Sequence, residues 1–319
     1  MGHKVVFAGT SEFAVPTLEA LIASPFEVVA VVTQPDKPKG RGREMQPPPA
    51  KVVAEAHSIP VLQPERMRDP AAIAEIKSYG PVWAMVVAAY GQIVPPELLN
   101  WPAHGCINVH GSLLPKYRGA APIQHALIAG EKQTGVTTML MDEGLDTGDI
   151  LLQQTVDIYP NENAGELSAR LALLGAELLI KTLVGIEEGT IVPIPQNDEL
   201  ATVARSLKRD AGAIDWSRSA DDIVNLIRGC TPRPGAFTSL DGRQAKVWKA
   251  VVAEREGRFG EPGEIIAADN SGITVAAGTG SVRLIEVQPE SRRRMSAAEY
   301  SRGGIKAGRK FDVRPAVSP

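Results

Sequence analysis

Runs of apolar, mostly β-branched residues alternate with helix-forming stretches along roughly the first 190 residues of the chain. The runs at residues 4–8, 27–33 and 82–88 are nearly continuous, as in strands that are buried on both faces of a sheet. Helices are expected at about residues 16–23, 50–57, 70–77 and 164–183. Because strands joined by helices pair in parallel through right-handed crossovers, this alternation predicts an α/β fold with a Rossmann-like, mostly parallel sheet.

The turns that follow the predicted strands are the expected place for a ligand. In an open parallel sheet the ligand binds at the carboxyl ends of the strands. Residues 9–10, 89–91 and 110–111 all fall at such ends. No Gly-x-Gly-x-x-Gly motif follows the first strand, so we predict no dinucleotide binding.

Residues 105–119 carry the densest set of reactive and conformationally special side chains. A strand is expected at 106–110, and residues two apart in a strand face the same side, so Asn108 and His110 would face one cleft together. That places an amide donor beside a titratable base. Gly111 allows the backbone to approach a ligand, and Ser112-Leu113-Leu114-Pro115 would form a stiff apolar turn with a hydroxyl at its start. A lone histidine at a strand end can also be purely structural.

A second candidate segment, residues 141–149, holds four acidic residues and two glycines and therefore cannot lie in a core. It stands between two apolar segments, and a loop between strands is a frequent place for a functional site. A carboxylate supplied there could orient an imidazole and favour its protonated form. Asp146 is the candidate for this role, and an acidic surface turn is the alternative.

Residues 34–49 are rich in proline and glycine and are expected to form neither helix nor strand. Long loops inside compact domains are uncommon and usually functional. This one carries four basic side chains, Lys37, Lys39, Arg41 and Arg43. It could clasp a phosphate backbone, or it could simply be a solvated loop.

The chain is expected to fold as two domains. Residues 190–208 lack periodicity and contain Pro193 and Pro195, which predicts a linker between a first domain, 1–189, and a second, 209–319. Five short strand-like runs beyond Pro234 suggest a small antiparallel, OB-like β-barrel. Residues 1–208 carry a net charge of −7 and residues 209–319 carry +4, an asymmetry that suggests a nucleic-acid contact in the second domain.

Other sequence features argue against several classes of protein. Cys106 and Cys230 stand in no Cys-x-x-Cys or Cys/His pattern, so neither a disulfide framework nor a zinc site is indicated. The longest apolar run, 82–90, is far shorter than the roughly 20 residues of a membrane span, and no signal-peptide core is visible. We therefore expect a soluble, cytoplasmic protein without a metal or a membrane contact, and no obligate protein partner is evident.

Asn108, His110 and Asp146, with Ser112-Leu113-Leu114-Pro115 and Arg118-Gly119 between them, resemble the signature of the formyltransferases that use 10-formyltetrahydrofolate. A wider match, from residues 6–10 through Gln34-Pro35-Asp36-Lys37-Pro38 to the C-terminal part, resembles the methionyl-tRNA formyltransferases within this family. The resemblance implies the formyltransferase fold, followed by an OB-like C-terminal tRNA-binding domain. It also implies transfer of a formyl group from 10-formyltetrahydrofolate to the free amino group of methionyl initiator tRNA, for translation initiation.

Roles for individual residues follow from this resemblance. Asn108 would stabilise a tetrahedral oxyanion, His110 would relay a proton, and Asp146 would hold His110 in the useful tautomer. The folate would contact Ser112, Leu113, Leu114, Pro115, Ala89, Tyr90, Gly91 and Asp142. The tRNA would contact Lys37, Lys39, Arg41, Arg43, Lys208, Lys246 and Lys249, with Arg41 matching the arginine that engages the acceptor end. Lys116-Tyr117 replaces a basic-aromatic pair that is sometimes Arg-Trp.

Two alternatives remain open. A related folate formyltransferase that acts on a small amine, such as a sugar nucleotide or glycinamide ribonucleotide, shares the Asn, His, Asp and Ser-Leu-Leu-Pro features. The basic loop and the basic second domain count against it. A non-enzymatic RNA-binding protein on an inactivated formyltransferase fold is opposed by the intact Asn108, His110 and Asp146.

Overall fold

The structure, a computed structural model, describes residues 2–39 and 44–314. It divides into two compact units. The first comprises Met1–Pro122, Thr134–Val156 and Ser168–Ala204, and the second comprises Ile123–Gln133, Asp157–Leu167 and Arg205–Pro319. The predicted linker is shared between them, because residues 190–204 group with the first unit and 205–208 with the second. The bounds 1–189, 190–208 and 209–319 stay a prediction.

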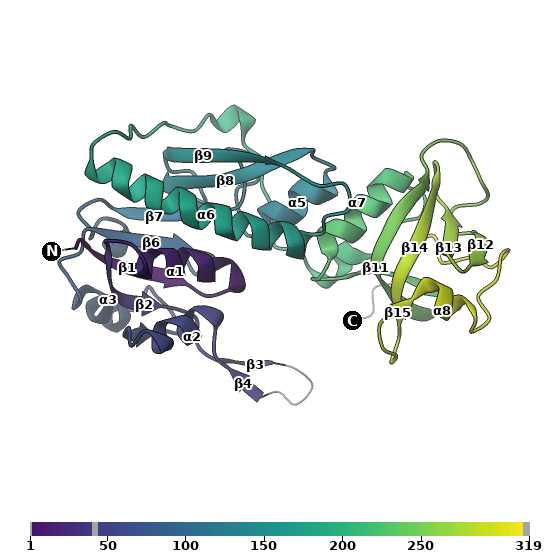
Figure 1. The fold of residues 1–319 in the computed structure, drawn as a ribbon, viewed down its shortest axis with the longest axis horizontal. Helices are drawn as coiled ribbons and strands as arrows, with labels where there is room; N and C mark the ends of the chain where they lie inside the picture. The colour runs from purple at the N-terminus through teal and green to yellow at the C-terminus, as the bar shows by residue number, and fades with distance from the viewer. Residues whose placement is uncertain (1, 40–43, 315–319) are drawn as a thin grey trace. The chain divides into compact units, whose positions relative to one another are not determined.

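A seven-stranded sheet, counted over the described residues, forms the centre of the first unit in the order β5-β2-β1-β6-β7-β8-β9 (Figure 1). The strands are β1 (Lys4–Gly9), β2 (Glu27–Val32), β5 (Val61–Leu62), β6 (Ala84–Ala88), β7 (Cys106–His110), β8 (Gln133–Leu140) and β9 (Ile150–Asp157). The pairs β1–β2, β1–β6, β2–β5 and β6–β7 are parallel, whereas β7–β8 is antiparallel. The predicted mostly parallel sheet is confirmed.

Helices α1 to α4 of this unit begin where the sequence supplies proline. The elements are η1 (Glu12–Ala14), α1 (Val15–Ile22), α2 (Pro49–Ala56), α3 (Pro70–Lys77), α4 (Pro96–Leu99), α6 (Ala164–Glu187) and η2 (Asp198–Leu200). Helices α1 to α4 each have a proline in the first two positions, where the missing N–H costs no hydrogen bond.

Helix α6 lies against β7 and β8 (Figure 1). A Cβ added at Gly175 would come within 2.7 Å of the Val109 side chain, so only glycine allows this close packing. The Thr138 and Thr182 hydroxyls are hydrogen-bonded across the same interface at 2.8 Å. Because side chains alternate along a strand, α6 covers the face of β7 that Val109 occupies and leaves the opposite face to Asn108 and His110.

The expectation of no strand at residues 34–49 is wrong. β3 (Lys37–Lys39) and β4 (Glu44–Gln46) pair antiparallel as a hairpin arm. Lys51 donates to Asp36 at 2.9 Å just before the arm begins. Hydrogen bonds from Gln63 and Lys51 lower the pKa of Asp36, so its charged form is favoured. These bonds fix Asp36, the residue directly before β3, in place.

The second unit contains an antiparallel sheet in the order β10-β11-β14-β13-β12, with β15 paired to β14. Its elements are α5 (Pro122–Ile128), η3 (Arg209–Gly212), α7 (Ala220–Cys230), β10 (Ala236–Leu240), β11 (Arg243–Glu254), β12 (Ile265–Asp269), β13 (Gly272–Ala276), β14 (Ser281–Pro289), β15 (Met295–Ser296) and α8 (Ala297–Ser301). The predicted antiparallel sheet domain is confirmed, and β15 is an addition to the five expected strands.

A buried apolar cluster holds this second unit together. Trp216 is fully buried, stacks on Phe311 at 5.8 Å, and satisfies its indole N–H by donating to Thr238. Ser219 caps α7, since its hydroxyl accepts from the Asp222 backbone N–H. Across the described residues, none of the helices has the length and apolar character needed to cross a membrane.

Candidate active site

The candidate site lies at the carboxyl end of β7, between its parallel neighbour β6 and its antiparallel neighbour β8. Asn108 and His110 are only 8% and 6% exposed. The described residues form no hydrogen bond to the side-chain amide of Asn108, and its atoms are not among the buried unpaired ones, so they keep access to solvent. Because this amide has no partner within the described protein, its two N–H donors are available to a bound molecule.

The hydrogen bond of His110 fixes its tautomer. Its Nε2 lies 3.0 Å from the backbone carbonyl oxygen of Tyr117, and because a carbonyl can only accept, Nε2 carries the proton. The other nitrogen, Nδ1, lies 3.7 Å from Asp146 Oδ2. In neutral imidazole Nδ1 is therefore the basic atom. Asp146 faces this basic nitrogen, and its expected role in holding the tautomer stays a prediction.

Asp146 is held by the turn that follows His110. Its Oδ2 accepts the Gly119 backbone N–H at 2.7 Å. Its φ is +53°, which is uncommon for a residue with a side chain and indicates a conformation imposed by its surroundings. The carboxylate can stabilise a proton on His110 Nδ1, so the pair is arranged for proton transfer.

The turn at residues 111–119 is hydrogen-bonded internally and to β8. The Ser112 hydroxyl, predicted to contact folate, donates to the Lys116 carbonyl at 2.7 Å. Thr137 in β8 donates to the Ser112 carbonyl and accepts the Leu114 N–H. Within this predicted folate segment, Leu114 is buried, while Leu113 and Pro115 are partly exposed. Contact of these four residues with folate stays a prediction.

The predicted folate residues at the end of β6 divide into two kinds. Tyr90 is 2% exposed and its side chain packs into the core cluster of this unit, where burial raises the pKa of its phenol to about 12. Its carbonyl accepts the Thr10 hydroxyl and thereby joins the carboxyl ends of β6 and β1. Ala89 and Gly91 are exposed and have φ of +44° and +87°. The backbone at these two positions, and not the Tyr90 ring, is therefore what a ligand could reach.

Asp142, the remaining predicted folate residue, helps to fold the loop at residues 141–149, called the acidic loop below. It is exposed, and its Oδ1 accepts the Thr147 hydroxyl at 2.6 Å and the Gly144 N–H at 3.0 Å. These bonds shape the loop that carries Asp146. Any role in folate binding is an addition to this structural one.

Sequence reasoning missed residues 196–204, which border the site although they were expected to be a linker. The Thr202 hydroxyl accepts the Tyr117 N–H at 2.8 Å, and the Thr202 carbonyl accepts the Arg118 N–H. The Gln196 side chain contacts both Arg118 and the acidic loop. No local pattern could have revealed these contacts, because the partners stand about 50 to 85 positions apart in the chain.

The predicted tRNA residues lie in both units. Lys37 is exposed in β3, Lys39 belongs to the same strand, and Arg41 and Arg43 lie outside the described residues. Lys208 is exposed, as are Lys246 and Lys249 in β11. Lys246 Nζ and the Arg294 guanidinium lie 5.5 Å and 5.0 Å from the centroid of the Trp248 ring, which gives this sheet a cationic and aromatic surface.

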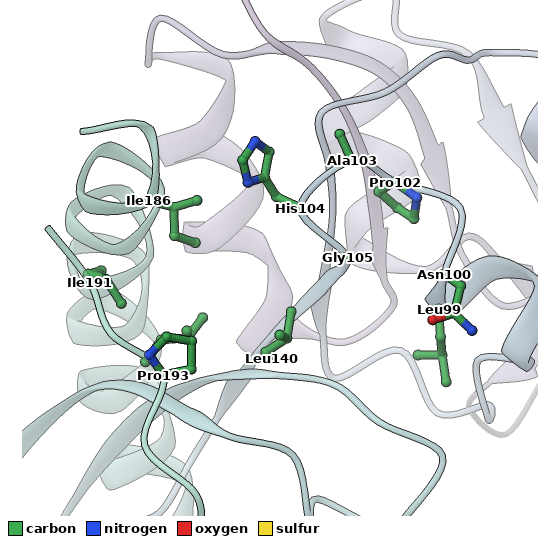
Figure 2. A pocket seen from close by; sticks show the side chains of 11 residues that line it. Leu99, Asn100, Pro102, Ala103, His104, Gly105, Leu140, Ile186, Ile191 and Pro193 are labelled. Atoms are coloured by element: carbon green, nitrogen blue, oxygen red, sulfur yellow. The ribbon is translucent and has the colours of Figure 1, made fainter. Parts of the chain in front are cut away.

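A pocket of about 430 Å³ lies next to the first residue of β7, at the end of the strand away from His110, and Figure 2 shows residues that line it. It is lined by Gly105, just before β7, by Leu140 at the end of β8, and by Ile186, Ile191 and other mainly apolar residues. None of the predicted site residues lines it. It is therefore separate from the candidate active site.

Two regions of the chain match known families. Residues 3–183 match the family described as Formyl transferase, and residues 206–304 match Formyl transferase, C-terminal domain. Methionyl-tRNA formyltransferase from Geobacter metallireducens is 50% identical, covering 96% of this chain and 99% of that protein. Methionyl-tRNA formyltransferase from Acetivibrio thermocellus is also 50% identical, covering 93% and 95%.

Solved structures with low sequence identity share the fold. An N-formyltransferase from Helicobacter canadensis, determined with folinic acid and dTDP-3-aminofucose, has a TM-score of 0.65 at 20% identity, covering 91% of this chain and all of that one. HypX from Aquifex aeolicus, determined with tetrahydrofolic acid, has a TM-score of 0.62 at 15% identity, covering 93% of this chain and 46% of that one. With the family matches across both units and half identity over nearly the full length, the chain belongs to the formyl transferase family.

Proposed function

We propose that this protein transfers the formyl group of 10-formyltetrahydrofolate to the free amino group of methionyl initiator tRNA, giving N-formylmethionyl-tRNA for translation initiation. The observation that carries the proposal is the arrangement at the end of β7. The unpartnered amide of Asn108 stands two residues from His110, whose basic Nδ1 faces Asp146 at 3.7 Å. Half identity to methionyl-tRNA formyltransferases over nearly the whole chain supports the choice of substrate.

The reaction needs a donor for an oxyanion, a group that carries a proton and a group that stabilises the protonated carrier. The candidate site offers Asn108, His110 and Asp146 for these roles. The amine nitrogen forms a bond to the formyl carbon, which gives a tetrahedral intermediate with a negatively charged oxygen. The Asn108 amide N–H donates to this oxyanion, an interaction whose loss typically costs about 10² to 10³ in turnover. Breaking the bond from carbon to N10 of the folate then completes the transfer.

A proton must also move from the attacking nitrogen to the leaving nitrogen. His110 Nδ1 accepts it, and the Asp146 carboxylate stabilises the imidazolium while the proton is held. The Tyr117 carbonyl keeps the other proton on Nε2 throughout, so the imidazole returns to the same tautomer after each turnover. The folate approaches along the exposed backbone at Ala89 and Gly91, since β6 is the direct neighbour of β7.

In the proposed function, the tRNA binds to basic side chains of both units. In this proposal the tRNA contacts Lys37 and Lys39 of β3, Arg41 and Arg43 in the sequence segment 34–49, and Lys208, Lys246 and Lys249 of the second unit. Lysine and arginine side chains neutralise phosphates, and the Trp248 surface between Lys246 and Arg294 adds an aromatic element. We place the reaction in the cytoplasm, with the initiator tRNA of protein synthesis.

Steady-state formylation of methionyl initiator tRNA tests the proposed roles. His110→Ala should lower kcat by at least about 10² because general acid–base catalysis typically contributes 10² to 10⁴. The KM values for tRNA and folate should change little. A His110→Ala variant with near wild-type kcat would show that another group moves the proton.

A further inference from the structure

The side-chain amide of Gln196 connects the two loops that hold the candidate catalytic pair. Its Nε2 donates to the backbone carbonyls of Asp146 at 2.8 Å and Gly148 at 2.6 Å. Its Oε1 accepts from Nε and Nη2 of Arg118 at 3.0 Å and 2.9 Å. Both amide protons and both oxygen lone pairs are therefore used, and a glutamine can offer no more.

These bonds close a ring around the His110 partner. Gly119, directly after Arg118, donates its N–H to Asp146 Oδ2 at 2.7 Å. Gln196 in turn joins the Arg118 side chain to the Asp146 carbonyl. The carboxylate and the backbone of Asp146 are thus both tied to the turn that follows His110.

Asp146 needs such a support, because its φ of +53° is unfavourable for a residue with a side chain. Without the bonds from Gln196, the loop at residues 141–149 could relax and take the carboxylate away from His110 Nδ1. A displacement of about 1 Å is enough to matter for a catalytic group.

The other partner of Arg118 cannot replace Gln196. Arg118 is 7% exposed, so its guanidinium must be paired inside the protein. Asp198 accepts from Arg118 at 2.7 Å, but its side chain is 82% exposed and it has no hydrogen bond to the acidic loop. Gln196 is the half-buried residue that connects Arg118 to Asp146.

We infer that Gln196 is a positioning residue for formyl transfer: its amide sets the place of Asp146 opposite His110. This inference rests on the proposed function. It assigns a role to a segment that the sequence marks only as a linker, and it predicts a defect in turnover and not in substrate binding.

Gln196→Glu tests the inference with little change in shape. Glutamate keeps an oxygen for Arg118 but places a second oxygen, in place of the NH₂ group, against the carbonyls of Asp146 and Gly148. Misplacing a catalytic group by about 1 Å can cost about 100-fold in rate. We expect kcat for methionyl-tRNA to fall by that factor, while the KM values for tRNA and folate stay near wild type.

Asp198→Asn is the matched control, because it alters the exposed partner of the same arginine in the same segment. It should keep the wild-type kcat. Gln196→Ala, which lets water reach the two carbonyls, is the second variant in case Gln196→Glu does not fold, and thermal unfolding checks each protein.

A double-mutant cycle separates positioning from a general structural effect. In an Asp146→Asn background, Gln196→Glu should lower kcat no further, since the group it positions is already lost. If both Gln196 variants kept the wild-type kcat, the inference would be wrong. It would also be wrong if Gln196→Glu lowered kcat by the same factor in the Asp146→Asn background as in the wild type. Neither result would contradict the proposed function. A wild-type protein without formylation activity would overturn the proposed function and this inference with it.

Discussion

Asn108 is the residue whose state in the structure most directly suggests a role. The residue is 8% exposed, and no hydrogen bond to its side-chain amide comes from the described part of the chain. The amide makes no hydrogen bond within the described protein but still reaches solvent, so it is open to a ligand. A bound formyl oxygen would satisfy it.

We therefore expect Asn108→Ala to lower kcat about 10²- to 10³-fold without loss of thermal stability, because the folded protein loses no hydrogen bond. Single-turnover formylation and a thermal melt measure the two quantities. A variant that retains turnover would place the oxyanion elsewhere, and one that melts well below wild type would show that the amide supports the fold.

The two cysteines provide a test at the residue scale that is independent of catalysis. Burial raises the pKa of the Cys106 and Cys230 thiols to about 12 from an ordinary value near 9. At pH 8 we expect a thiol reagent to modify neither in the folded protein and both in denaturant. Between about pH 9 and 12 the unfolded chain loses thiol protons that the folded chain keeps, so stability should fall as pH rises through that window. Rapid labelling of the folded protein would contradict the burial of these thiols.

At the scale of elements, the turn after β7 and the segment at residues 202–204 depend on close contact. A Cβ added at Gly119 would lie 2.8 Å from the Ala204 carbonyl oxygen, and Gly119 has a φ of +117°. Gly119→Ala should therefore destabilise the protein by about 1 to 3 kcal/mol and lower kcat as well, since Gly119 binds Asp146. Denaturant unfolding and formylation kinetics measure both effects.

Gly189→Ala is the control for this prediction. Gly189 also has a positive φ, +67°, but no atom lies within 4 Å of the added Cβ. Gly189→Ala should lower the free energy of unfolding only by the cost of backbone strain, and its kcat should stay at the wild-type value. If Gly119→Ala and Gly189→Ala changed the free energy of unfolding and kcat by the same amounts, the contact between Gly119 and Ala204 would contribute to neither.

The hairpin arm formed by β3 and β4 gives the second prediction at this scale. Lys37→Ala should raise the KM for tRNA and leave folate affinity unchanged, because in the proposed function the arm contacts tRNA phosphates, and Lys37 is exposed. Arg41→Ala should act in the same direction. Folate binding measured by fluorescence, beside tRNA kinetics, distinguishes the outcomes; equal weakening of both ligands would reject the role of the arm.

Which elements could be predicted from sequence depends on whether the information is local. β1, β2 and β6 are buried apolar runs, and their patterns alone identify them. The β3–β4 hairpin pairs lysine, proline, glutamate and methionine without apolar alternation, so only the contact between its strands reveals it. Asn108 and His110 were predictable because β-strand alternation is local, whereas the Tyr117 carbonyl and Gln196 reach the site through turns that no periodicity describes.

At the scale of the whole molecule, charge is divided between the two parts of the chain. Residues 1–208 carry −7 and residues 209–319 carry +4, so the C-terminal part of the chain is suited to a polyanion. Each lysine that neutralises a phosphate contributes about one to the slope of log affinity against log salt. Lys246→Ala and Lys249→Ala should each lower that slope by about one for tRNA binding. Unchanged slopes would remove these residues from the RNA surface.

The most direct test of the central claim is transfer of labelled formyl from 10-formyltetrahydrofolate to methionyl initiator tRNA, with elongator methionyl-tRNA and an amino sugar nucleotide in parallel. We predict formylated product on the initiator tRNA alone. Product only on the amino sugar would contradict the proposed substrate and leave the chemistry at Asn108, His110 and Asp146 in place. No product on any acceptor would contradict the claim that this chain is a formyltransferase of methionyl-tRNA.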